Sequence, residues 1–286
     1  MTVTVSRHLA PKPNAAAFAE ELSTDVGRLV DRFEESAEMI DFAFSNALLT
    51  AQAHYMADPE AARLETWKAT VTALQVGSAL FAVTGADEGR VECFISHRAR
   101  SIPALGPRTY ADADAWLNTL WLAMICRDQP RLRQLSEIPL ERLRMREGMY
   151  DDFVYDWIDV LQTYWLRGPG LVDKLTAAFE SSAPERIRVA TPQVVAQVLY
   201  PPLSLFYQIV TRKQEEFAPS LVQALEAHRD YWTSEESWAT KTKGAVPLGP
   251  LAMACHAFDG DFPLDIESEY LPKYLLNHGW LGEFPT

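Results

Sequence analysis

Apolar residues recur at spacings of three and four along most of this chain, and glycines and prolines interrupt the pattern at intervals. The first series comprises Phe18, Leu22, Val26, Leu29 and Phe33. This spacing places side chains on one face of an α-helix. A chain patterned in this way can bury its apolar faces only by packing helix against helix, so we predict a mainly α fold.

Further helices follow from the same spacing. The apolar series over residues 39–55 and 64–81 predict a second and a third helix. Asp58 followed by Pro59 is typical of a helix start, since the carboxylate can accept from free backbone N–H groups and proline suits the first position. Gly77 and Ser78 are small and would let a neighbouring helix approach closely. Thr109 with Asp112 resembles a capping box before the next helix.

In the second half of the chain, prolines and glycines mark the expected boundaries. We predict one helix from Asp151, a break over residues 168–170, and a partner helix carried by Leu171, Leu175 and Phe179. A further helix should start at Thr191-Pro192. Pro201-Pro202 should kink or end the latter helix because proline lacks a backbone donor. Further helices are expected over residues 203–217 and 219–232.

One short segment has the alternating pattern of a β-strand. Val91, Cys93 and Ile95 alternate with Glu92, Phe94 and Ser96, and a return strand would run from Arg98 to Ile102 after a turn at Ser96-His97. The predicted fold is therefore an irregular stack of α-helical hairpins, similar to tetratricopeptide stacks, with one small β-hairpin. No linker or low-complexity tract divides the chain, so we expect one domain over residues 1–286, with residues 1–13 as an irregular lead-in.

Several segments carry a family resemblance. Residues 246–286 join an apolar small-residue segment, an acidic turn region, a short amphipathic piece ending in Asn277-His278-Gly279, and an apolar tail. The stretch LETWKATVTALQVGSALFAVT at residues 64–84, Val91-Glu92-Cys93 and residues 102–111 and 116–126 add to it. Together they resemble the immunity protein 49 family of bacterial polymorphic toxin systems. That resemblance implies a cytoplasmic protein that binds a toxin and blocks it, and it implies no catalytic residues.

The charge of the chain restricts its partners. The formal net charge is -13 over 286 residues. Such a surface repels nucleic acid and anionic membranes, and it attracts a basic partner through electrostatic steering. No apolar run is long enough to span a membrane, and no signal peptide precedes the first helix. The three cysteines are widely spaced in apolar contexts, which suits reduced thiols in the cytoplasm.

Two acidic groups are candidates for toxin binding. The first comprises Asp151, Asp152, Asp156 and Asp159, with Tyr155 among them as an aromatic anchor. Asp152, Asp156 and Asp159 share a helix face, where their like charges repel one another. These carboxylates could form ion pairs with lysine or arginine side chains of a basic partner. The alternative interpretation is a solvated first turn favoured by the helix dipole.

The second acidic group lies near the end of the chain and comprises Asp259, Asp261, Asp265, Glu267 and Glu269. Carboxylates near His256 and His278 are of metal-ligand type, but their spacing does not match a calcium loop. We therefore expect a solvated acidic rim with no metal or cofactor. A metal-dependent hydrolase using this region is the competing class, and a helical scaffold for several partners is a third.

The sequence thus predicts a protein that works by binding and not by catalysis. The recognised nucleophile, metal-protease and nucleotide-binding motifs do not occur in it. The expected partner is a cognate, basic protein toxin that is neutralised by stoichiometric occlusion. Aromatic residues would supply affinity, and carboxylates would supply steering. The oligomeric state is left open.

Overall fold

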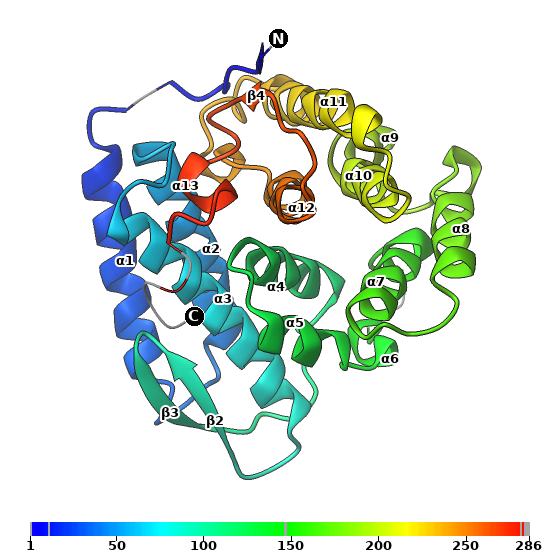
Figure 1. Ribbon diagram of the computed structural model, residues 1–286. Coiled ribbons are helices and arrows are strands. Elements are labelled where there is room, and N and C mark those ends of the chain that lie inside the picture. Colours follow the sequence, from blue (N-terminus) through cyan, green and yellow to red (C-terminus); the bar gives the residue numbers. More distant parts are fainter. Residues whose placement is uncertain (1, 11, 146–147, 281, 283–286) are drawn as a thin grey trace.

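The computed structural model describes residues 2–10, 12–145, 148–280 and 282. Most of the apolar tail expected after residue 279 (281 and 283–286) therefore lies outside the described residues. The fold is mainly α with two small strand pairs, so the predicted class, including the β-hairpin, is confirmed. Figure 1 shows the helices arranged around α4 and α12. Among the described residues, every helix is too short or too polar to cross a lipid bilayer.

Three helices form the first layer of the stack. They are α1 (Ala15–Asp31), α2 (Ile40–Ala57) and α3 (Leu64–Gly85), with α1 packed on α2 and α2 on α3. The buried face of α1 is rotated from the predicted one: Ala15, Ala19, Val26 and Val30 point inward, whereas Phe18 is 40% exposed. Small side chains on the inner face let α1 approach α2, and this displaces the large Phe18 to the edge.

Asp58 does not start the third helix where the sequence predicted. The helix begins at Leu64, and Asp58 instead directly follows α2. Its buried carboxylate accepts from the backbone N–H groups of Ala62 and Arg63, at 3.1 and 2.9 Å, and from the hydroxyl of Thr66 at 2.6 Å. One carboxylate thereby satisfies donors of both the connecting loop and the first turn of α3.

The close approach expected at Gly77 is present. A Cβ atom at this position would lie 2.5 Å from Thr119 Oγ1 and 2.7 Å from a ring carbon of Phe44. Gly77 therefore admits α2 and α4 (Ala113–Ile125) to the same point on α3. The predicted hairpin follows α3 as strands β2 (Arg90–Ile95) and β3 (Arg98–Pro103), paired antiparallel.

The turn of the hairpin has the geometry that favours a right-handed twist. Ser96 and His97 both have positive φ, 52° and 62°, as in a two-residue type I′ turn. The buried Arg100 attaches the hairpin to α1, since its guanidinium donates to the carbonyl of Val30 and pairs with Asp31 at 2.9 Å.

Helix α4 begins three residues later than a Thr109 capping box would place it. Asp112 is itself the N-cap, and its carboxylate accepts from the N–H of Ala115 at 3.0 Å. Two short helices that the periodicity did not predict follow: α5 (Gln129–Ser136) and α6 (Leu140–Leu143). Both are much shorter than the window of about 11–18 residues over which a helical spacing is recognised.

The next hairpin consists of α7 (Asp152–Trp165) and α8 (Leu171–Ser181), which pack on one another. The predicted break between them is confirmed, with Gly170 at φ 81° before α8. A short 3-10 turn, η1 (Pro184–Arg186), leads to α9 (Pro192–Val194). The predicted cap is also present, since the Thr191 hydroxyl accepts from the N–H of Val194.

The two prolines at 201 and 202 do not end a helix. Residues Val195–Leu199 form a π-helical segment, η2, and α10 (Tyr200–Val210) continues from it with both prolines in its first turn. The wider π turn changes the hydrogen-bond register just where proline cannot donate, so the helical path continues. Helix α11 (Gln214–Thr233) includes Pro219, which the sequence placed at a helix start.

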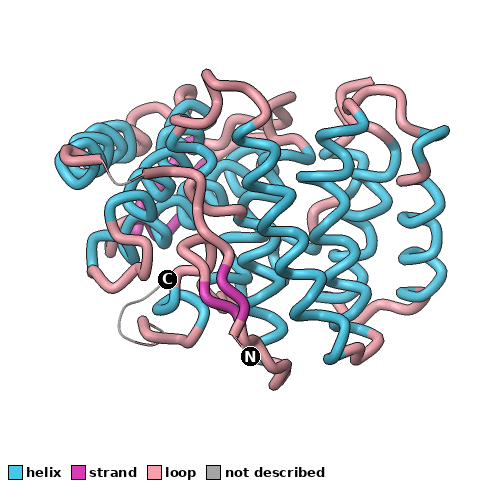
Figure 2. The backbone as a smooth tube through the Cα atoms, turned by 90° about the horizontal axis from the view of Figure 1, so that it is seen from above, coloured by secondary structure: helices cyan, strands magenta, loops and turns pink. Residues whose placement is uncertain are grey.

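The C-terminal elements return to the middle of the molecule. After the 3-10 turn η3 (Thr242–Gly244), α12 (Leu248–Asp259) packs on α4 and α10. Strand β4 (Ile266–Glu267) and the short α13 (Lys273–Leu276) follow. The lead-in predicted as irregular contains β1 (Val3–Thr4), which pairs in parallel with β4. Figure 2 shows this strand pair on one edge of the helical array.

Candidate functional site

The structure separates the acidic residues that the sequence grouped on α7. Asp151 is only 5% exposed, and its carboxylate accepts from three consecutive backbone N–H groups, those of Arg188, Val189 and Ala190, at 2.5, 2.9 and 2.8 Å. Burial opposes ionisation, but these hydrogen bonds outweigh it and lower the pKa of Asp151. This carboxylate attaches the segment before α9 to the start of α7.

The remaining residues of that group have different surroundings. Tyr155 is 3% exposed and lies under the guanidinium of Arg144, 4.2 Å from the ring centre. Asp152 is exposed and pairs with Arg144 at 3.2 Å, and Asp159 pairs with Lys174 of α8 at 2.8 Å. Asp156 is partly exposed between them. Only Asp152, Asp156 and Asp159 therefore face outward, and two of these carboxylates already have a cationic partner.

In the C-terminal acidic group, Asp259 is part of an internal network. Its carboxylate pairs with Arg127 at 3.1 Å and with His278 at 2.5 Å. Arg127 also donates to the carbonyls of Leu275 and Leu276 at the end of α13. The network thus holds α13 and the residues after it against the ends of α4 and α12.

The other four acids of this group line the segment around β4. Asp261, Asp265, Glu267 and Glu269 are all exposed. Glu269 lies 3.5 Å from the buried Arg7. In the described part of the chain, no three His, Cys, Asp or Glu side chains gather closely enough to hold a metal ion, and no hydrogen bond or ion pair joins this group to that on α7.

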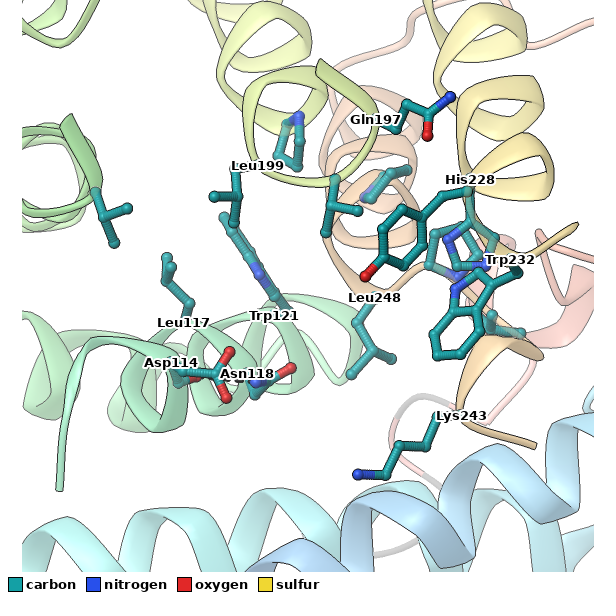
Figure 3. Close-up of a pocket in the computed structure, with 18 of the residues that line it drawn as sticks. Asp114, Leu117, Asn118, Trp121, Gln197, Leu199, His228, Trp232, Lys243 and Leu248 are labelled. Carbon is teal, nitrogen blue, oxygen red and sulfur yellow. Dashed lines mark hydrogen bonds between the residues drawn. The ribbon is translucent and has the colours of Figure 1, made fainter. Parts of the chain in front are cut away.

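A cleft of about 260 Å³ lies beside α7 and was not singled out from the sequence. Residues of α2, α4, α7, η2, α10, α11 and the segment 243–250 line it. Figure 3 shows side chains from these elements converging on it, with Asp114, Asn118 and Lys243 on one side and Gln197 and His228 on the other. Segments between residues 52 and 250 that are distant in the sequence thus contribute to one concave surface.

Helix α4 supplies one wall of the cleft. Asp114, Leu117, Asn118 and Trp121 all line it, at spacings of three and four that place them on one face of the helix. Asp114 remains open to solvent, whereas Trp121 is 7% exposed. The wall therefore changes from charged to aromatic along the helix axis.

Aromatic rings make up much of the opposite walls. Trp157 lies 6.3 Å from Trp121 between ring centres, and it packs edge-on against Phe206 at 5.2 Å. Trp232 lines the far side, with the ring of His8 stacked parallel to it at 6.5 Å. These contacts fix the rings in place, so the apolar part of the cleft is formed before any partner arrives.

The polar groups in the cleft differ in how well they are satisfied. His228 Nε2 donates to the carbonyl of Gly244 at 2.9 Å, and burial lowers the pKa of His228 to about 4. The Oε1 atom of Gln197 is buried without a hydrogen-bond partner among the described residues.

Two contacts hold the segment 243–250 in the wall. Gln52 exchanges two hydrogen bonds with the backbone of Val246, at 2.9 and 2.8 Å. Gly249 passes close to α10, since a Cβ atom there would lie 2.8 Å from the ring of Pro202. The absence of a side chain at Gly249 thus sets the width of the cleft at this point.

The sequence signature of immunity protein 49 matches residues 58–275. The chain belongs to the immunity protein 49 family. The matched range includes every residue that lines the cleft except Gln52. None of the curated proteins and none of the solved structures matches the chain.

The sequence offered a partial signal for the cleft of this immunity protein 49 member. Asp114 and Asn118 interrupt the apolar residues of α4 at helical spacing, which places polar groups on a face shared with Leu117 and Trp121. The π-helical turn that brings in Gln197 had no such signal, because its register depends on how the prolines pack in the fold. Lys243 and His228 meet there only through tertiary structure.

Proposed function

We propose that this protein is an immunity protein that binds a cognate toxin and neutralises it by covering the toxin's active site or substrate path. The observation that carries the proposal is the family match over residues 58–275, which spans most of the helical stack. Immunity proteins act by binding, so no catalytic residue is required. The preformed, partly aromatic cleft supports the same view, since aromatic residues in concave surroundings are frequent anchors of protein interfaces.

The charge of the protein favours a basic toxin. With a net charge of -13, the surface attracts a cationic partner from beyond contact distance and raises the association rate. We assign this steering to the outward acids of α7 and to the exposed acids around β4, and affinity to buried contacts elsewhere. Asp156 is the clearest example, since it has no ion pair among the described residues.

The proposed location is the cytoplasm, where such a protein meets an incoming or self-made toxin. Cys93, Cys126 and Cys255 are free thiols, which suits a reducing compartment. Burial raises the pKa of Cys93 and of Cys255 to about 11, so both thiols stay protonated and unreactive at neutral pH. We further propose that residues 1–286 fold as one unit.

Co-expression tests the proposal directly. The toxin domain encoded beside this gene is induced in a sensitive bacterium with and without the protein, and survival is scored. We expect full protection, and a 1:1 complex on size-exclusion chromatography of the two purified proteins. Equal killing with and without the protein would refute the proposal, and so would protection by substoichiometric amounts that leave the toxin chemically changed.

A further inference from the structure

We propose that the cleft receives a basic segment of the toxin, with an arginine side chain at Asp114 and an apolar or aromatic neighbour beside Trp121. The inference rests on the proposed function and adds the site and the chemistry of its occupant. It differs from the charge-steering role of the outward acids, because it concerns a shaped site with its own unsatisfied groups.

The first argument is the hydrogen-bonding balance of the cleft. Asp114 is exposed and forms no ion pair within 4.0 Å among the described residues, although Asn118 hydrogen-bonds its side chain and the charge of Lys243 also acts on it. Gln197 adds a buried acceptor without a partner on the η2 side. A buried acceptor without a partner, together with an exposed carboxylate that has no ion pair, favours a ligand rich in N–H donors.

The second argument is the aromatic wall next to these acceptors. Guanidinium groups stack on aromatic rings and donate through a planar fork, and they are more weakly hydrated than ammonium groups. Of the tryptophans that line the cleft, Trp157 is buried and Trp121 is 7% exposed, whereas the partly exposed Trp232 offers an accessible ring. An arginine therefore fits the combination better than a lysine.

The third argument is size. Asp114 and Trp121 are seven residues apart on α4, which is about 10 Å along the helix axis at roughly 1.5 Å per residue. A volume of about 260 Å³ is slightly below the range of about 300–1,000 Å³ that small-molecule sites occupy. The cleft thus suits two adjacent side chains of a protein segment, one charged and one apolar, entering from outside.

Lys243 provides a way to test whether the ligand is positively or negatively charged. Its exposed side chain lines the same cleft, and Figure 3 shows it on the side of Asp114 and Asn118. A cationic occupant is repelled by Lys243 and attracted by Asp114, whereas an anionic occupant responds in the opposite way. Removing each charge in turn therefore distinguishes the two.

The experiment uses the full-length protein and three acetylated, amidated dipeptides: Arg-Trp, citrulline-Trp and Glu-Trp. Affinities are measured by NMR titration of wild type, Asp114→Asn, Lys243→Ala and the control Asp173→Asn, which removes an exposed aspartate of α8 outside the cleft. We expect Arg-Trp to bind about tenfold more tightly than citrulline-Trp, which corresponds to about 1.4 kcal/mol for a charge-assisted contact.

The two charge variants should change the affinity for Arg-Trp in opposite directions. Asp114→Asn should weaken Arg-Trp binding about tenfold and leave citrulline-Trp unchanged, Lys243→Ala should strengthen Arg-Trp binding about twofold to fivefold, and Asp173→Asn should change nothing. Tightest binding of Glu-Trp, weaker Arg-Trp binding in Lys243→Ala, or no binding of Arg-Trp at millimolar concentration would overturn the inference. Far-UV circular dichroism confirms that each variant is folded.

The same variants separate this inference from the proposed function. In the co-expression assay, wild type that fails to protect refutes the immunity role. Wild type and Asp114→Asn that protect equally, with equal dissociation rates of the toxin complex, leave the immunity role standing and refute the cleft as its site. Protection by wild type with a dissociation rate about tenfold faster for Asp114→Asn supports both.

Discussion

The buried carboxylate of Asp151 should make a large contribution to stability, although its neighbour Asp152 should make almost none. Asp151 accepts from three backbone N–H groups between Arg188 and Ala190. Hydrogen bonds to a charged group contribute about 1.5–3 kcal/mol each. In Asp151→Asn one oxygen becomes an NH2 group that faces a backbone donor, so at least one bond is lost and the charge is removed from the others.

We therefore expect Asp151→Asn to lower the free energy of unfolding by about 2–4 kcal/mol. Asp152→Asn is the matched control: its carboxylate is exposed and forms only a surface ion pair with Arg144 at 3.2 Å, which contributes about 0–1 kcal/mol. Urea denaturation followed by circular dichroism measures both. Amide hydrogen exchange should also accelerate at Val189 and Ala190 in the first variant only.

The difference between wild type and Asp151→Asn should depend on pH in a defined direction. The pKa of Asp151 is lower in the folded than in the unfolded protein, where it is about 3.9. Its stabilisation is therefore complete above about pH 5 and is lost as the pH falls through the folded pKa. Equal unfolding energies for the two neighbouring variants, or a difference that does not shrink as the pH is lowered below the unfolded pKa, would refute the reasoning.

Two further predictions concern a helix contact and a buried histidine. Gly77→Ala should destabilise the protein by about 1–2 kcal/mol in urea titration, because the steric cost of placing a methyl group against Thr119 and Phe44 exceeds the gain in helix propensity. A Cβ atom at Gly27 would meet no neighbouring atom within 4 Å, so Gly27→Ala should stabilise α1 by up to about 1 kcal/mol. Equal changes in stability for the two variants would contradict the close contact at Gly77. Burial lowers the pKa of His228 to about 4, so between pH 6.5 and 4 the unfolded chain takes up a proton that the folded chain does not. Stability should fall on acidification by up to about 1.4 kcal/mol per pH unit, and His228→Gln should flatten this slope when melting is followed from pH 7 to 5.

The sequence predicted the helices where helical spacing coincided with strong breakers. The hairpin α7–α8 and the turn at Ser96 and His97 are examples, since glycine, proline and short polar turn residues act locally. The sequence-based prediction was wrong where a side chain forms hydrogen bonds across a loop to a helix that begins several residues later. Asp58 looked like the cap of an adjacent helix, yet its carboxylate reaches Thr66, eight residues on.

The candidate site was less predictable than the fold. A run of aspartates shows that charge is present but not how deep each one lies, so Asp151 and Tyr155 were grouped with outward residues although both are buried. The cleft depends on a π-helical turn and on Gly249 passing Pro202, both of which arise from packing between distant segments. Only the polar residues on the inner face of α4 could have indicated it.

The pairing of β1 with β4 has a consequence for how the protein meets a partner. Open helical solenoids change their curvature easily, because each end is free and each repeat contacts only its neighbours. Here the N-terminal strand is hydrogen-bonded to a segment near the other end of the chain, and Arg7 donates to the carbonyl of Tyr55 at the end of α2. The concave surface should therefore have the same width before and after a ligand binds, and the protein should lose little conformational entropy on association.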